Sequence, residues 1–164
     1  MKELFIIRHA KSIWEDQSIS DFNRPLNERG RTDAPLMGGV IKDNGFIPDL
    51  IISSSANRAI STAKEIAKKV GYPIENIVEE RKIYETDFNR VVGIINQIDD
   101  KYKRVFIFGH NPTFTHLIEE LGGEYIGNLP TCGVAALRFE FESWEMVTAK
   151  TGTQFYFDFP KRHK

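Results

Sequence analysis

The sequence predicts an α/β fold of three layers, with helices on both faces of a central, mostly parallel mixed sheet and an antiparallel hairpin at the C-terminus. Short apolar runs alternate with helical patterns through most of the chain, which is typical of strands covered by helices. After Cys132 the period changes, because apolar residues alternate with charged ones, as in Leu137-Arg138-Phe139-Glu140. This alternation indicates antiparallel strands with one face in solvent.

The strands predicted before Cys132 cover residues 3–8, 50–53, 77–83 and 104–108. The alternating segments 135–141 and 155–159 are expected to form the C-terminal hairpin. The basic tail, residues 161–164, is interpreted as a solvated chain end.

Helices are predicted where apolar residues recur every three or four positions. The helix over 56–70 has such a face and should end at Gly71. A second helix is expected over 88–98, and a third from Pro112 to Gly122 and Gly123. The segment 27–44 is also helical in pattern, but Pro35 interrupts it, so we expect a kink or a restart there.

Length and charge limit the function classes. With 164 residues the chain fits a single domain, 1–164, with its own hydrophobic core. The formal net charge is −1, so no global field attracts nucleic acid or an anionic membrane, and neither is expected as a partner. One cysteine excludes an intrachain disulfide framework, and Met1 leads directly into a strand with no apolar leader. We therefore expect a cytoplasmic protein.

Two histidines follow buried strands at their carboxyl ends. His9 comes after the first apolar run, with Arg8 before it, and His110 comes after the run 104–108. A third run ends in three serines and opens a helix that carries Arg58 near its start. In open α/β sheets, ligands bind at this edge of the sheet, where loops and helix N-termini converge. Two histidines and two arginines there predict a site for phosphoryl groups.

Each of these residues has a candidate role. His9 can act as a nucleophile if its lone pair is aimed at phosphorus, and Arg8 and Arg58 can clamp the phosphoryl oxygens. His110, if protonated, would add another positive donor, and Asn111 can orient the loop. Each histidine taken alone also fits an ordinary hydrogen-bonded residue at a strand end. Their joint occurrence favours the catalytic interpretation.

Acid-base chemistry needs a carboxyl group at the same edge of the sheet. Glu85 and Asp87 follow the predicted third strand, and Glu85 is the preferred proton donor. The alternative is that either is a solvated loop carboxylate. Arg24 lies on the long loop after the first strand and is a candidate third phosphate-binding cation. Its alternative is a surface arginine paired with Asp21.

No cofactor or metal is expected. The four histidines are scattered and show no metal-ligand spacing, and cations flank the candidate carboxylates. The sequence has no Gly-rich phosphate loop with Lys-Ser/Thr, so nucleotide hydrolysis of that type is not predicted.

In this order, Arg8-His9-Ala10, the segment 53–59 (SSSANRA) and the segment 109–112 (GHNP) resemble the histidine phosphatase superfamily, which is phosphoglycerate-mutase-like in fold. More narrowly, the chain resembles the short SixA-type phosphohistidine phosphatases, and the loop 21–30 and Leu129-Pro130-Thr131 extend the resemblance over most of the chain. It implies that His9 is the phosphorylated nucleophile and that Arg8, Arg58 and His110 form the phosphate pocket. Ala10 and Ser55 replace a glycine and a proline common in the family, without removing a functional group.

The resemblance implies a metal-independent phosphatase that works through a phosphohistidine intermediate and dephosphorylates phosphohistidine on a partner protein. One alternative is a phosphatase for small phosphate monoesters, and another is a phospho-ligand binding module without turnover. The chain has no room for the helical insertion that covers the active site in mutases of the superfamily. An open pocket admits a phosphorylated side chain and retains a phosphorylated intermediate poorly against water, which favours phosphatase over mutase.

Overall fold

The computed structural model describes all residues, 1–164. Its core is one six-stranded sheet with the strand order β3-β2-β4-β1-β5-β6. The strands are β1 (Lys2–Arg8), β2 (Leu50–Ser53), β3 (Val78–Glu79), β4 (Arg104–Gly109), β5 (Val134–Phe139) and β6 (Thr153–Asp158). The first four are parallel, whereas β5 is antiparallel to β1 and to β6. The sheet is therefore mixed, with an antiparallel C-terminal hairpin, as the sequence predicts.

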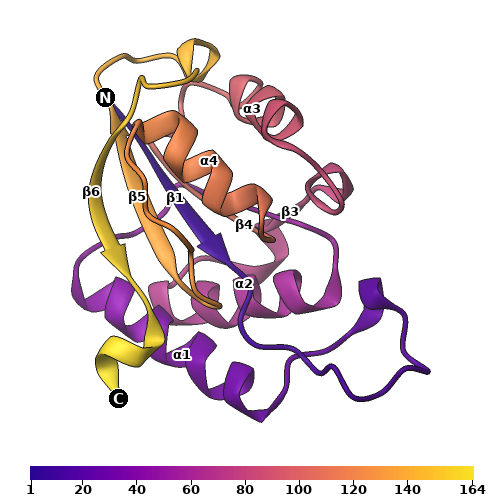
Figure 1. Cartoon of the computed structure of the whole chain (residues 1–164). Coiled ribbons are helices and arrows are strands. Elements are labelled where there is room, and N and C mark those ends of the chain that lie inside the picture. Colours follow the sequence, from indigo (N-terminus) through magenta and orange to yellow (C-terminus); the bar gives the residue numbers. More distant parts are fainter.

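Four α-helices cover the two faces of the sheet (Figure 1). The helices α1 (Glu28–Asp43) and α2 (Asn57–Val70) pack on one face, and α3 (Phe88–Asn96) and α4 (Thr113–Gly122) lie on the other. The side chains of β1 alternate between two hydrophobic clusters, because Leu4 and Ile6 face α4 while Phe5 and Ile7 face α1 and α2. The three predicted layers are confirmed.

The predicted strand over 77–83 is too long. Only Val78 and Glu79 form β3, and Arg81–Ile83 is a 3₁₀ helix. The Glu80 side chain accepts a hydrogen bond from the backbone N–H of Lys82, which turns the chain away from the sheet. Ile83 is then buried by this turn rather than by strand pairing, so its apolar side chain gives no evidence of a strand.

Pro35 does not divide the segment 27–44 into two helices, because α1 runs unbroken from Glu28 to Asp43. Proline removes one backbone donor, and the remaining turns are held by buried Ala34, Met37 and Ile41 against the core. Of the two alternatives expected at Pro35, a kink or a restart, the restart is therefore wrong. The helix predicted over 88–98 is also slightly too long, since α3 ends at Asn96.

The hairpin is less exposed than its alternating pattern predicts. Residues Val134 to Leu137 of β5 are all buried, because β5 lies between β1 and β6 and both of its faces are covered. The expected solvent face is confined to β6, whose residues are mostly half-buried. Beyond β6, residues 161–164 are exposed, and Pro160–His163 forms a short 3₁₀ helix. None of the helices combines the length and apolarity that crossing a membrane requires.

Candidate active site

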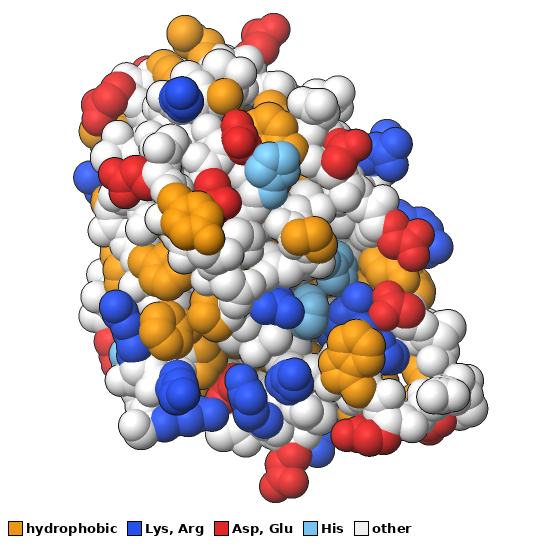
Figure 2. Space-filling model, in the orientation of Figure 1, with side chains coloured by type: hydrophobic (Ala, Val, Ile, Leu, Met, Phe, Trp, Pro, Cys, Tyr) orange, Lys and Arg blue, Asp and Glu red, His pale blue; other side chains and the backbone are white.

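The two histidines meet because β1 and β4 are adjacent and parallel. Arg8 is paired in register with Gly109, so His9 and His110 follow these strands at the same edge of the sheet. The backbone N–H of His9 donates to the carbonyl of Gly109 at 3.0 Å, and the two imidazole centroids are 5.3 Å apart. In the space-filling view two neighbouring histidine side chains lie among Lys and Arg atoms on the right of the molecule (Figure 2).

The backbone determines which nitrogen of His9 carries a proton. His9 Nδ1 lies 2.7 Å from the carbonyl oxygen of Ala10, which can only accept, so Nδ1–H is the donor. In a neutral ring, Nε2 then carries the lone pair. The next backbone N–H, of Ala10, donates to Thr62 Oγ1 at 2.9 Å and holds this turn against α2.

The same surroundings keep His9 uncharged. Burial lowers its pKa to about 3, with further lowering by His110, Arg58 and Arg8, although the hydrogen bond to Ala10 opposes the shift. The residue is only 8% exposed. At neutral pH His9 is therefore a neutral imidazole with a free lone pair on Nε2, the form that a nucleophile requires.

Two of the predicted phosphate-binding arginines, Arg8 and Arg58, each keep an unpartnered donor. Arg58, near the start of α2 and 6% exposed, donates from Nη1 and Nη2 to the backbone and side chain of Asp21, at 2.7 and 3.1 Å. Arg8 donates from Nη1 to the carbonyl of Leu129 at 3.0 Å. The Nε atoms of both arginines are buried and have no hydrogen-bond partner, and neither has His110 Nδ1. Buried polar groups without partners are costly, so these three nitrogens are candidates to contact a bound oxyanion.

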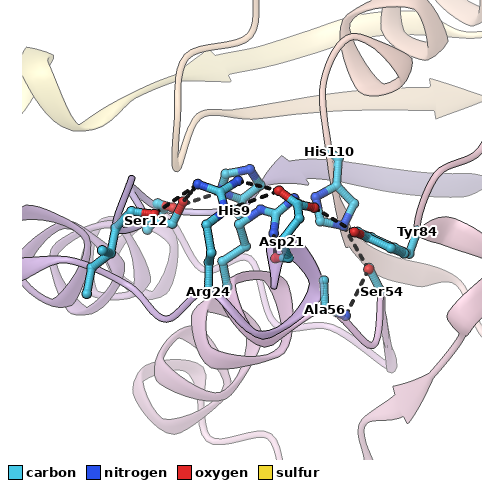
Figure 3. Close-up of polar contacts among 11 residues, drawn as sticks. His9, Ser12, Asp21, Arg24, Ser54, Ala56, Tyr84 and His110 are labelled. Atoms are coloured by element: carbon cyan, nitrogen blue, oxygen red, sulfur yellow. Dashed lines mark hydrogen bonds and ion pairs between the residues drawn. The ribbon is translucent and has the colours of Figure 1, made fainter. Parts of the chain in front are cut away.

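Asp21 is the residue of the site that the sequence interpretation missed. Its carboxylate joins three side chains: Oδ1 accepts from Arg24 Nη2 at 2.7 Å, and Oδ2 accepts from Arg58 and, at 2.6 Å, from the Tyr84 hydroxyl (Figure 3). Burial alone would raise its pKa, but Tyr84, Arg24 and Arg58 hold the pKa of Asp21 well below its usual range. The only signal in the sequence was its three-residue spacing from Arg24.

Arg24, the candidate third phosphate-binding cation, is not a surface arginine. It is 8% exposed and stacks on the ring of Trp14, with 4.0 Å between the guanidinium carbon and the ring centroid. Its Nε and Nη2 donate to Asp21, and its Nη1 donates to Ser12 Oγ and the carbonyl of Ile13. Four of its five N–H groups are thus used within its own loop, which leaves one for a ligand. The alternative pairing with Asp21 exists, but Arg24 itself is buried rather than at the surface.

His110 is neutral in the free protein. Burial lowers its pKa to about 4, and Arg58, Arg8 and Arg24 add to the shift while Asp21 opposes it. The protonated form considered in the sequence analysis is therefore not the form present at neutral pH before an anion binds. Its neighbour Asn111 ties α4 to the following loop, because its amide donates to the Leu129 carbonyl and accepts from Thr115.

The two candidate proton donors have different surroundings. Asp87 caps α3, since its Oδ1 accepts from the backbone N–H of Arg90 at 2.9 Å. Glu85 is exposed, has no hydrogen bond or ion pair, and adopts a φ of 52°, in the left-handed region. It follows Tyr84, whose pKa burial and the hydrogen bond to Asp21 raise to about 12. Glu85 is thus the carboxylate that is free to move.

The chain has no group of three His, Cys, Asp or Glu side chains placed to hold a metal ion. The chemical groups that converge on the site are a neutral histidine with an available lone pair, a second neutral histidine, and arginines. This set suits attack on a phosphorus atom whose negative oxygens are held by cations.

Fold and site together define an α/β protein with a crevice of histidines and arginines at the carboxyl edge of its parallel strands. Residues 4–106 match the family model of the histidine phosphatase superfamily (branch 1), and the chain belongs to this superfamily.

Solved structures of SixA proteins resemble this chain over its whole length. A putative phosphohistidine phosphatase SixA from Agrobacterium tumefaciens is 27% identical, with a TM-score of 0.82 over 97% of this chain and 98% of that one. A protein histidine phosphatase SixA in complex with tungstate has a TM-score of 0.85 at 22% identity, over 99% of both chains, and shares the fold.

Two sequence relatives match most of this chain. An uncharacterized protein of Mycobacterium tuberculosis (strain ATCC 25618 / H37Rv) is 32% identical, over 80% of this chain and 86% of its own. An uncharacterized chloroplastic protein of Arabidopsis thaliana is 29% identical, over 92% of this chain and 72% of its own. Family membership and the likeness to SixA structures support phosphatase activity.

Proposed function

We propose that this protein is a metal-independent phosphatase that acts through a phosphohistidine intermediate on His9, and that its substrate is phosphohistidine on a partner protein. The observation that carries the proposal is the state of His9: a neutral ring whose Nδ1–H is held by Ala10, so that Nε2 keeps its lone pair beside buried, unpartnered arginine donors.

In the first step His9 Nε2 forms a bond to phosphorus while the bond from phosphorus to the leaving group breaks. Arg8 and Arg58 donate to the phosphoryl oxygens, whose charge spreads in the transition state. In the second step a water oxygen attacks the phosphorus of phosphohistidine, gives up a proton, and returns His9 to its neutral form with release of inorganic phosphate. Glu85 is the proposed group that donates a proton to the leaving group and accepts one from the water.

A protein substrate is favoured by the lack of any inserted element over the site. His9 and His110 directly follow β1 and β4, and α2 begins within a few residues of β2. The long loop between β1 and α1 is attached to the start of α2. The Asn57 side chain donates to the backbone carbonyl of Asn23, and Arg58 donates to that of Asp21. A histidine on the surface of another protein can approach such a crevice. The SixA structure that is 27% identical bears the name of a phosphohistidine phosphatase.

The testing experiment is a turnover panel in which phosphate release is measured from a phosphohistidine protein, from sugar phosphates and from p-nitrophenyl phosphate, with and without EDTA. We expect the highest kcat/KM on the phosphohistidine protein and no effect of EDTA. Preference for a sugar phosphate would show that the substrate is a small phosphate monoester and not a phosphohistidine protein. Tight binding of these compounds without phosphate release would identify a binding module.

His9→Ala is the matched control, because it removes the attacking nitrogen at a strand end and leaves the core side chains in place. We expect it to abolish turnover while circular dichroism and the unfolding midpoint stay close to wild type. Wild-type enzyme quenched during turnover should carry an acid-labile, alkali-stable phosphate on His9. Detection of the phosphate on Ser53, Ser54 or Ser55 by mass spectrometry would assign the nucleophile to a serine.

A further inference from the structure

Ser54 lies where β2 ends and is completely buried, directly below His110. Its hydroxyl oxygen is within hydrogen-bonding distance of two groups (Figure 3). The backbone N–H of Ala56 donates to Ser54 Oγ at 3.2 Å, and His110 Nε2 lies 2.8 Å from it. The adjacent Ser53 hydroxyl is engaged elsewhere, since it donates to the carbonyl of Ser54 at 2.9 Å.

Counting protons at Ser54 assigns the tautomer of His110. A serine hydroxyl has one hydrogen to donate, and the N–H of Ala56 cannot accept it. The sole acceptor that Ser54 Oγ has within reach is therefore His110 Nε2. If Nε2 carried the proton instead, the buried Ser54 hydroxyl hydrogen would have no acceptor, which is costly in the interior.

The other ring nitrogen, His110 Nδ1, is buried and has no hydrogen-bond partner in the protein. With Nε2 accepting from Ser54, the neutral ring carries its proton on Nδ1. We propose that Ser54 is a positioning residue that holds His110 as the Nδ1–H tautomer, so that this histidine presents a neutral hydrogen-bond donor to a phosphoryl oxygen.

The two neighbouring histidines then have the same tautomer and opposite roles. His9 directs its Nδ1–H to the backbone of Ala10 and keeps the Nε2 lone pair for the site. His110 directs Nε2 to Ser54 and keeps Nδ1–H. The other tautomer of His110 would point a lone pair at a negatively charged oxygen and repel it. The tautomer itself follows from the contacts alone, and only its effect on rate rests on the proposed function.

The direct test is the tautomer of His110 in the wild-type protein, measured by two-bond ¹H–¹⁵N correlation NMR on histidine-labelled protein near pH 7.5. His110→Asn identifies the His110 signals among those of the four histidines. We expect a protonated, pyrrole-type Nδ1 and a pyridine-type Nε2. A pyrrole-type Nε2 on His110 would overturn the proposal without any variant of Ser54.

Variants test the part played by the serine. Ser54→Ala should convert His110 to a mixture of tautomers and lower kcat with p-nitrophenyl phosphate about tenfold or more, up to the loss of about 100-fold expected for one preorganised donor. Ser54→Thr retains the hydroxyl and should retain the wild-type His110 spectrum. Ser53→Ala is the matched control, because it removes an adjacent buried hydroxyl that does not touch His110, and it should leave that spectrum unchanged.

The outcomes separate this inference from the proposed function. Wild-type protein that releases no phosphate, yet shows the Nδ1–H tautomer that Ser54→Ala disturbs, would refute the phosphatase proposal and retain this one. An unchanged His110 spectrum in folded Ser54→Ala, or an equal change in Ser53→Ala, would refute the role of Ser54 even in an active enzyme.

Discussion

The charged side chains of this site are linked to one another by hydrogen bonds and ion pairs. The Asp21 carboxylate neutralises part of the positive charge of Arg24 and Arg58, and the Tyr84 hydroxyl donates to the same carboxylate. Because Asp21 accepts from the Nη atoms of Arg58, the guanidinium is held in one orientation with its Nε still free. A phosphoryl group therefore meets an arginine that is already oriented, which reduces the entropy lost in the transition state.

Arg58→Ala should reduce kcat/KM by about 100-fold, corresponding to about 3 kcal/mol of transition-state stabilisation, as for loss of one preorganised oxyanion donor. Arg58→Lys should recover only part of this loss, because an ammonium group cannot reproduce the planar fork that Asp21 orients. Steady-state kinetics with p-nitrophenyl phosphate measure both effects. Full activity in the lysine variant would show that charge alone suffices.

Glu85→Gln should slow hydrolysis of an alkyl phosphate by about 100-fold or more, because an alkoxide leaving group needs a proton as its bond to phosphorus breaks. Phosphohistidine can be protonated on its other ring nitrogen beforehand, so its cleavage should slow much less. The measurement is the single-turnover rate of His9 phosphorylation by each substrate. Asp87→Ala is the companion variant: it should lower the unfolding midpoint of the protein, because Asp87 caps α3, and leave this rate close to wild type.

Equal losses on the two substrates in Glu85→Gln would remove Glu85 from the leaving-group role. Wild-type rates on both would assign the proton to solvent or to Asp87.

At the level of elements, the site depends on the close approach of α1 to the turn after His9. A Cβ atom added to Gly30, in the first turn of α1, would lie 2.1 Å from the backbone carbonyl oxygen of Lys11. The Asn27 side chain caps the same turn by accepting from the N–H of Gly30, and the backbone N–H of Asn27 donates to the Lys11 carbonyl. These contacts therefore hold the start of α1 against the segment that follows His9.

Gly30→Ala should lower the free energy of unfolding by about 1–3 kcal/mol, the range for overpacking, and reduce kcat by displacing the segment after His9. Gly39→Ala, in the same helix, is the matched control, because nothing lies within 4 Å of its added Cβ. That change should raise stability by about 0.5–1 kcal/mol through the higher helix propensity of alanine. Chemical denaturation of both variants checks the pair, and equal stability losses would show that the contact with Lys11 relaxes without cost.

For the whole molecule, two buried neutral histidines make stability depend on pH. Folding lowers the pKa values of His9 and His110 to about 3 and about 4, from 6.5 in both cases. Below about pH 6.5 the unfolded chain therefore binds protons that the folded chain does not, and stability falls as the pH falls. Asp21 contributes at lower pH. Folding lowers its pKa below the ordinary value of 3.8, so its ionised carboxylate stabilises the folded state above about pH 3.8, and this stabilisation is lost as the pH falls further.

The free energy of unfolding should therefore decrease between pH 6.5 and 4.5, by up to about 1.4 kcal/mol per pH unit for each of the two histidines. Urea unfolding at a series of pH values measures the slope. His9→Ala should reduce it, whereas His116→Gln, which changes an exposed histidine on α4, should not. A slope unaffected by His9→Ala would contradict the buried neutral state of His9.

Sequence patterns predicted the elements well where the pattern is local. The apolar face of α2 and the left-handed Gly71 that ends it, with a φ of 79°, were both readable from spacing and composition. The same holds for the positions of His9 and His110 after buried strands. Patterns were misleading at Pro35 and at the segment 77–83, where burial of neighbouring side chains outweighed local preference.

What the sequence by itself determined is the set of candidate site residues, namely His9, His110, Arg8 and Arg58, and the edge of the sheet at which they lie. The tertiary structure alone decided their chemical states. Burial removes the positive charge of both histidines, and contacts with Ala10 and Ser54 select the nitrogen that carries each proton. Asp21 reaches Arg58 across 37 residues of sequence, a contact that no local pattern encodes. The physical reason is that pKa and tautomer depend on surroundings assembled by folding, whereas residue type and periodicity are present in the chain itself.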